Sequence, residues 1–217
     1  MLQLHISTMV GKLLGLRAMS TNTTGNAFCN RMYENSNEKT ICSYCYSQSM
    51  LRTYRKNMQP CLERNSKLLS SSLLEDRQIP TIIENVFRFH AHGELINEIH
   101  FKNFLAITRK NPHCIFTLWT KRFPIINKVL EKETKPKNLI LIYSNPLINT
   151  LINPMKSEKL KKYFDKTFNN VEHDKFVEEQ NCTGQKCMDC LECYSKNDTL
   201  MIVEAIKING RVKKLER

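Results

Sequence analysis

The chain has 217 residues, enough for one domain with a substantial core or for two small ones. Its hydrophobic content of 41% and charged content of 25% are those of a globular protein and exclude a disordered chain. No apolar run approaches the ~20 residues of a membrane helix. Lys12 and Arg17 interrupt the stretch that a signal peptide would keep apolar. We therefore expect a cytoplasmic protein with no membrane partner.

The formal net charge is +12, from 33 Lys and Arg against 21 Asp and Glu. Such an excess favours anionic partners, and a nucleic acid or nucleotide is one expected substrate class. The basic residues are dispersed rather than gathered in one run, so an ordinary solvated surface remains the alternative.

The first half of the chain alternates between apolar and polar segments. Residues 2–6 predict a short strand, and residues 20–45 are polar, irregular and rich in cysteine. A helical pattern runs from residue 48 to about residue 75, and Pro60 predicts a break and restart within it.

The second half alternates predicted strands with predicted helices. Strands are expected at residues 85–90, 114–119, 139–143 and 200–208, and helices at residues 96–110, 123–133 and 158–168. This alternation predicts βαβ units and a parallel sheet, either an open doubly wound sheet or a partial barrel. In both, functional residues gather at the carboxyl ends of the strands.

Nine cysteines in a chain without an export signal indicate metal or redox work rather than disulfides. The first group is Cys29, Cys42 and Cys45, with twelve and then two residues between them. Three thiolates leave one iron of a cubane free, whereas on zinc they would leave an open site. Cys61 and Cys114 lie outside the groups and are expected to be ordinary thiols.

The second group is Cys182, Cys187, Cys190 and Cys193, with four, two and two residues between them. Four cysteines in twelve residues resemble the runs that hold cubane clusters. A structural zinc site usually takes its ligands from two separate pairs, so zinc is the second interpretation.

The turn after the strand at 85–90 carries His90, His92, Gly93 and Glu94. The two histidines and the carboxylate are candidate metal ligands. Alternatively, Gly93 allows a ligand to approach the backbone and Glu94 binds its ammonium group. A solvated turn is the third alternative.

Taken together, Cys29, Cys42 and Cys45, followed after a strand by Gly93 and Glu94, resemble the radical S-adenosylmethionine superfamily. Within it the chain is similar to the phage family called gene product 88. The long first spacing departs from the usual three-then-two pattern, and only Gly and Glu remain of the family's Gly-Gly-Glu-Pro motif.

The resemblance implies a single α/β domain over residues 1–217, a partial (β/α) barrel with an auxiliary cluster segment at 178–197. Its first 4Fe–4S cluster would use Cys29, Cys42 and Cys45, and its auxiliary 4Fe–4S cluster the second cysteine group. S-adenosylmethionine would contact the following residues: Tyr44 at the adenine, His92, Gly93 and Glu94 at the amino group, and Thr120, Ser144 and Asn145 at the ribose or carboxylate.

The implied activity is reductive cleavage of S-adenosylmethionine, which yields a 5′-deoxyadenosyl radical that abstracts hydrogen from an unknown substrate. An electron donor such as a flavodoxin or ferredoxin would be the partner, in the host cytoplasm if the protein is phage-encoded. The competing hypotheses are a zinc-containing nucleic-acid-binding protein without catalysis and an electron carrier resembling a ferredoxin.

Overall fold

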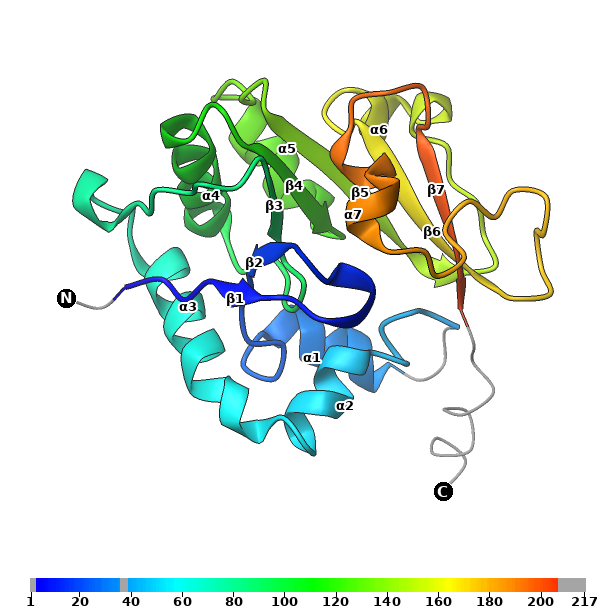
Figure 1. Ribbon diagram of the computed structural model, residues 1–217, viewed down its shortest axis with the longest axis horizontal. Helices are drawn as coiled ribbons and strands as arrows, with labels where there is room; N and C mark the ends of the chain where they lie inside the picture. The colour runs from blue at the N-terminus through cyan, green and yellow to red at the C-terminus, as the bar shows by residue number, and fades with distance from the viewer. Residues whose placement is uncertain (1–2, 36–38, 207–217) are drawn as a thin grey trace.

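The computed structural model describes residues 3–35 and 39–206, which form a mostly parallel sheet with helices around it (Figure 1). Its strands are β1 (Ser7–Thr8), β2 (Arg17–Met19), β3 (Val86–Phe89), β4 (Ile115–Thr120), β5 (Leu139–Ile148), β6 (Lys166–Glu172) and β7 (Met201–Ile206). Its α-helices are α1 (Ala27–Glu34), α2 (Tyr46–Arg52), α3 (Gln59–Ser71), α4 (Glu98–Lys110), α5 (Phe123–Leu130), α6 (Glu158–Lys161) and α7 (Cys187–Cys190). No helix in this described part of the chain is long and apolar enough to cross a membrane.

The seven strands lie in the sheet in the same order as in the chain. β1 pairs antiparallel with β2, and every later neighbour pairs parallel. A doubly wound sheet reverses its strand order at a switch point, and this sheet has no such reversal. The strand order therefore excludes the doubly wound alternative and leaves an α/β sheet that winds in one direction.

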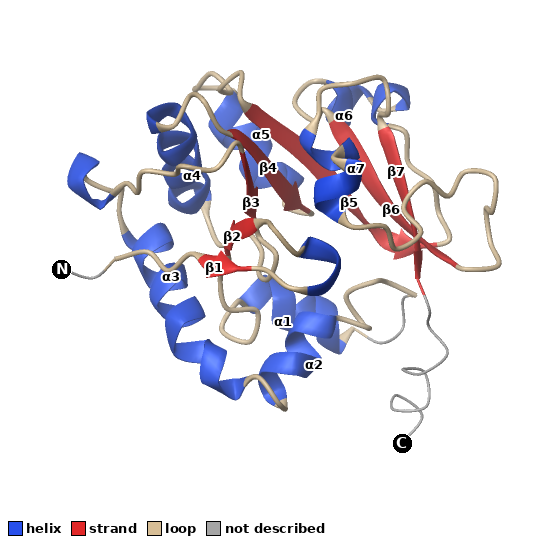
Figure 2. Cartoon of the chain, in the orientation of Figure 1, coloured by secondary structure: helices blue, strands red, loops and turns tan. Residues whose placement is uncertain are grey.

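One face of the sheet is covered by helices. Phe87 and Phe89 of β3 and Phe116 of β4 are fully buried there. The Phe89 ring stacks on Phe116, and the Phe87 ring meets both at steeper angles. Side chains of α3, α4 and α5 complete this core, and Phe104 of α4 stacks on Phe89 with ring centroids 4.0 Å apart. In Figure 2, α4 accordingly stands to the left of β3, and α5 lies partly behind β4 and β5.

The opposite face of the sheet is covered by the C-terminal cysteine segment. Successive strand residues point to opposite faces, so Trp119 and Ile140 face away from the helices and pack against Tyr194. The turn η5 (Glu192–Tyr194) and helix α7 lie on this face (Figure 1). Burial on both faces explains the uninterrupted apolar run at the start of β5.

The N-terminal half differs from the sequence expectation. The strand expected at 2–6 is wrong over residues 3–6, because the first pairing is at β1, while residue 2 lies outside the described residues. Strand β2 was missed because three residues show little periodicity. The polar segment 20–45 contains α1, which Asn26 caps. The break at Pro60 is confirmed, since Pro60 stands in the first turn of α3.

The helix expected at 158–168 is also wrong beyond its first turn. It stops at Lys161, and the chain enters β6 at Lys166. Polar residues of β6 are buried because their side chains are hydrogen-bonded: Asn169 accepts from the backbone N–H of Ile152 at 2.9 Å. Buried amides hide the apolar pattern by which a strand is recognised. The last expected strand is confirmed as β7, although residues 207 and 208 lie outside the described residues.

Candidate functional site

The first cysteine group follows the carboxyl end of β2. Cys29 lies in the first turn of α1, where the Asn26 side chain accepts from the backbone N–H of Phe28 at 3.0 Å and of Cys29 at 3.3 Å. Cys42 and Cys45 share one turn, closed by a 3.0 Å hydrogen bond from the backbone N–H of Cys45 to the carbonyl of Cys42. The short spacing therefore places these two thiols on the same turn.

The loop that carries Cys42 and Cys45 is attached to the end of β5. The backbone N–H of Ile41 donates to the carbonyl of Pro146 at 2.8 Å, and Thr40 forms an antiparallel bridge with Leu147. These bonds bring the long insertion after Cys29 back to the carboxyl edge of the sheet.

The three thiols share one electrostatic environment. Burial contributes most to the raised pKa of the Cys29 thiol, followed by the charges of Glu94, Cys45 and Cys42, while Lys121 opposes them. Burial also raises the pKa of Cys42, against the effect of Lys121 and with that of Cys45 and Glu94. Three thiols, one carboxylate and one ammonium thus lie within mutual electrostatic reach, at the edge where the sequence predicts them.

Lys121 is the member of this group that sequence reasoning missed. Burial alone would lower the pKa of Lys121, but the three thiols and Glu94 raise it above its ordinary value. Its ammonium donates to the Ser144 hydroxyl at 2.9 Å. The available signal was its place directly after Thr120, at the carboxyl end of a predicted strand.

The Glu94 carboxylate is buried, 5% exposed, and joins the ends of β3 and β4. One oxygen accepts from the backbone N–H of Leu95 at 2.8 Å and from the Thr120 hydroxyl at 2.5 Å. The other accepts from the backbone N–H of Lys121 at 2.8 Å. A carboxylate has about four acceptor positions, so these bonds leave one for an external ammonium group.

The weaker candidates from the sequence occupy different roles. Thr120 positions Glu94, and its oxygen also accepts from the backbone N–H of Arg122 at 3.0 Å. Ser144 accepts from Lys121, whereas the buried Asn145 amide donates to the carbonyl of Thr150 at 2.6 Å and to Asn169 at 3.1 Å. Tyr44 lies on the turn between the paired cysteines. That these residues and His92 contact a cofactor stays a prediction.

Gly93 occupies a position that a side chain cannot share. Its φ is +100°, in the left-handed region, and an added Cβ would overlap the Thr21 hydroxyl and lie 2.7 Å from the Thr21 carbonyl oxygen. The backbone N–H of Thr21 donates to the carbonyl of His92 at 3.1 Å, so the turn and the start of the cysteine loop are in direct contact. Glycine is required here because of close backbone approach.

The histidines beside this turn are not arranged as a metal site. His90 and His100 are buried and meet edge to face, with ring centroids 5.2 Å apart. Across residues 3–35 and 39–206, no group of three or more His, Cys, Asp or Glu side chains is placed to hold one metal ion. A cubane distributes its thiolates over separate irons, so its ligands need only surround a common space.

The second cysteine group surrounds such a space. Cys182, Cys187, Cys190 and Cys193 all line one cavity, together with apolar side chains such as Ile202. Burial raises the pKa of the Cys193 thiol to about 12, Arg88 lowers it, and the other three cysteines raise it. The donor set is the one that a four-cysteine cluster requires, whereas the cavity between the thiols, about 20 Å³, is smaller than such a cluster.

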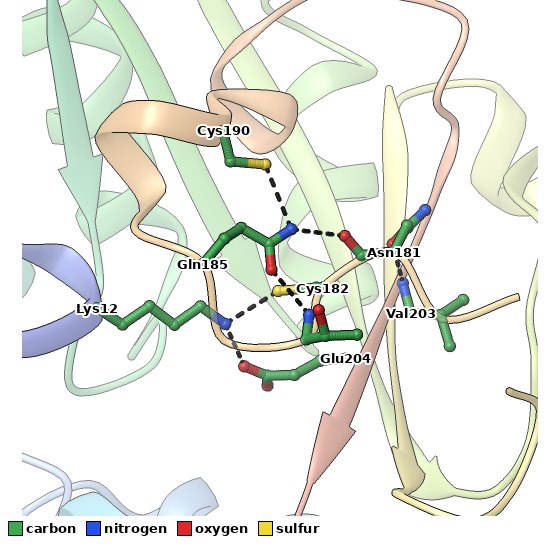
Figure 3. A network of polar contacts seen from close by, with 8 residues as sticks. Lys12, Asn181, Cys182, Gln185, Cys190, Val203 and Glu204 are labelled. Atoms are coloured by element: carbon green, nitrogen blue, oxygen red, sulfur yellow. Dashed lines mark hydrogen bonds and ion pairs between the residues drawn. The ribbon is translucent and has the colours of Figure 1, made fainter.

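Lys12 reaches this cavity from the N-terminal hairpin (Figure 3). Its ammonium donates to the Cys182 sulfur at 2.9 Å and to Glu204 at 2.6 Å. The Gln185 amide donates to the Asn181 carbonyl at 2.8 Å and closes the loop (Figure 3). Lys12 thus brings a positive charge into hydrogen-bond contact with one thiol. No local sequence motif predicts this contact.

Gly93→Ala tests the turn. We expect it to lower the free energy of unfolding by about 1–3 kcal/mol, because strain at a positive φ adds to the clash with Thr21. Chemical denaturation monitored by circular dichroism gives this value. Gly184→Ala is the matched control for a positive φ in open space, since nothing lies within 4 Å of its added Cβ. Equal losses in both variants would contradict a specific role for Thr21.

Acidification tests the buried histidines. Burial, with a smaller effect of Arg88, lowers the pKa of His90 to about 3 and that of His92 to about 4. The unfolded chain therefore binds protons first as pH falls below about 6.5, so stability is complete above this pH and falls below it. We expect the free energy of unfolding to fall by about 1.4 kcal/mol per pH unit for each of these two histidines.

Denaturation between pH 6.5 and pH 5 measures this slope, above most carboxylate titration. His90→Asn keeps a residue that tolerates positive φ and should flatten the slope by one proton. The exposed His173→Gln is the control and should not change it. A slope unaffected by His90→Asn would be the contrary result.

Comparison with known proteins gives one match, to a family model. The family model described as Gene product 88 matches residues 7–190, which include the first cysteine group, the Gly93–Glu94 turn and part of the second group. No curated protein and no solved structure matches the chain. The match covers well over half of the chain, so this protein belongs to the phage Gene product 88 family.

Proposed function

We propose that this protein is a radical S-adenosylmethionine enzyme with an auxiliary 4Fe–4S cluster. The observation that carries the proposal is the gathering of Cys29, Cys42 and Cys45 beside Glu94 and Lys121. The consecutive parallel order from β2 to β7 supports a partial (β/α) barrel, whose functional edge is the carboxyl end of the strands.

At the first site, three thiolates would hold the cluster and leave one iron open. When bound, the cluster and S-adenosylmethionine would supply an electron and the radical that abstracts hydrogen. The chain's own residues would orient the cofactor. Glu94 would accept from its amino group through the remaining acceptor position, and Thr120 would hold Glu94 for this role.

Lys121 would balance charge at the same site. A three-cysteine cluster is negative overall, and a buried negative charge requires compensation. The Lys121 ammonium lies among the groups that raise its pKa, so it remains protonated at neutral pH. Ser144 would keep it in place.

The second cysteine group would hold the auxiliary cluster. All four thiols are available, which favours a fully ligated cluster that relays electrons or braces the segment. Arg88 would lie between the two sites: it stacks 3.8 Å above the Trp119 ring and lowers the pKa of His92 on one side and of Cys193 on the other. A flavodoxin or ferredoxin in the host cytoplasm would supply electrons.

The alternative is a zinc-containing nucleic-acid-binding protein. Its four-cysteine segment would hold a structural zinc, and the excess of positive charge would bind the polynucleotide. Anaerobic purification followed by iron, sulfide and zinc analysis separates the two. Eight irons and eight sulfides per chain are expected from two cubanes. Zinc without sulfide would overturn the proposal in favour of this alternative.

Cys42→Ala tests the assignment of the first cluster. We expect it to abolish formation of 5′-deoxyadenosine from S-adenosylmethionine and to remove about half of the iron, because the second cluster stays loaded. Cys61→Ala is the matched control: this thiol donates to the carbonyl of Met58 and belongs to neither group. Cleavage by the Cys42→Ala protein would show that the sites are wrongly assigned.

Lys12→Gln tests the second site. A charged donor to a ligating sulfur stabilises the reduced, more negative cluster. We therefore expect the auxiliary cluster of the variant to have a lower midpoint potential, by about 59 mV for a tenfold change in a one-electron equilibrium. Redox titration followed by electron paramagnetic resonance measures it, with the exposed Lys196→Gln as the control of equal charge. If the variant holds its auxiliary cluster and the midpoint potential is unchanged, Lys12 does not act on that cluster.

A further inference from the structure

The surface around the first site is strongly basic. Within residues 27–35 and 39–67, Lys and Arg outnumber Glu by seven to two. Most of these residues come from α1, α2, α3 and the link between α2 and α3, which carries Arg55 and Lys56. Helices α1 and α2 and the start of α3 lie side by side at the lower edge of the molecule in Figure 1. The excess charge of the chain is therefore not spread evenly, and part of it borders the first cysteine group.

Several of these arginines are held over aromatic rings. The guanidinium of Arg52 lies 5.5 Å from the ring centre of Tyr33, and those of Arg31 and Arg122 lie 5.6 Å and 4.8 Å from the ring centre of Phe28. Arg52 also donates to Gln48 at 3.1 Å and Arg122 to the Leu95 carbonyl at 3.1 Å. Each guanidinium carries five N–H donors, so cation–π contact and one internal bond restrict it and leave further donors for a ligand. The arrangement supplies oriented positive charge beside Cys29.

Two tyrosines form the outer part of the same surface. Tyr46 is 49% exposed and Tyr54 is 65% exposed, and the Tyr54 hydroxyl donates to that of Tyr46 at 3.0 Å. Tyr46 follows Cys45 directly, and its ring centre lies 6.4 Å from that of His92. Arg55 also acts on His92 and lowers its pKa, after burial and Arg88. The exposed rings therefore lie beside the first cysteine group.

We propose that this surface, defined by Arg31, Tyr46, Arg52, Tyr54, Arg55 and Arg122, binds a single-stranded polynucleotide. Phosphates would contact the arginines, and unpaired bases would stack on the exposed tyrosines. An acidic protein segment would satisfy the charge but would not need exposed rings in this position. That the polynucleotide is also the substrate of the first site rests on the proposed function; its binding does not.

Fluorescence anisotropy with labelled single strands of about 12 nucleotides tests the proposal on the full chain. RNA and DNA probes of the same sequence, measured in parallel, show which of the two polynucleotides the surface prefers. Arg55→Gln with Lys56→Gln removes two exposed charges, that of Arg55 and that of Lys56, which follows it in the chain and borders the same surface. We expect weaker binding with a salt slope smaller by about 1.4, about 0.7 for each lost contact. The control, Lys156→Gln with Lys159→Gln near α6, removes the same charge from another surface and should bind like wild type.

Tyr54 separates stacking from charge. Tyr54→Ala should weaken binding about tenfold, whereas Tyr54→Phe keeps the ring and should preserve affinity. Equal losses in both double-charge variants, or no effect of Tyr54→Ala, would overturn the proposal in favour of a nonspecific polyanion surface. Iron and sulfide analysis of the same preparation tests the proposed function separately, so binding without iron would leave this proposal standing and overturn only the proposed function.

Discussion

A single buried carboxylate connects the parts of the first site. Glu94 sits at the end of β3 and accepts from the hydroxyl of Thr120 and the backbone N–H of Lys121, at the end of β4. Its own backbone carbonyl accepts from Asn26 at 3.0 Å, and Asn26 caps the helix that carries Cys29. The cysteine loop, the glycine turn and Lys121 are therefore positioned together: Thr120 and Lys121 satisfy the buried carboxylate, and Asn26 satisfies the backbone carbonyl of the same residue.

The two faces of the sheet perform different tasks. Helices α3, α4 and α5 bury one face with aromatic and branched side chains, which supplies most of the hydrophobic core. The cysteine segment near Tyr194 covers the other face, where Trp119 and Ile140 would otherwise meet water. Cys187 and Cys193 thus pack against this part of the core. A metal or cluster held by these thiols, as proposed above, would therefore also stabilise the sheet.

Positive charge recurs wherever thiols gather. Lys121 faces the first group, and Lys12 donates to Cys182 in the second. Burial raises the pKa of Cys187 and Cys193 in the second group, and Arg88, held on the ring of Trp119, lowers it. Thiols must lose protons to ligate metal, and nearby cations favour that loss against the cost of burial. Some of the basic residues therefore act on buried thiols, and the excess of positive charge is not confined to the surface.

The sequence by itself determined the α/β class, the strands at β3, β4, β5 and β7, the two cysteine groups and the turn at Gly93 and Glu94. Alternating polarity, apolar runs and short residue spacings reveal these features, because each depends on residues that are close together in the sequence. It did not reveal β2, β6, Lys121 or Lys12. β6 buries amides such as Asn169, whose partners lie on other segments, and Lys12 meets Cys182 across 170 residues of chain. Only tertiary structure decides such contacts, because the free energy that buries a polar side chain comes from a partner distant in the sequence.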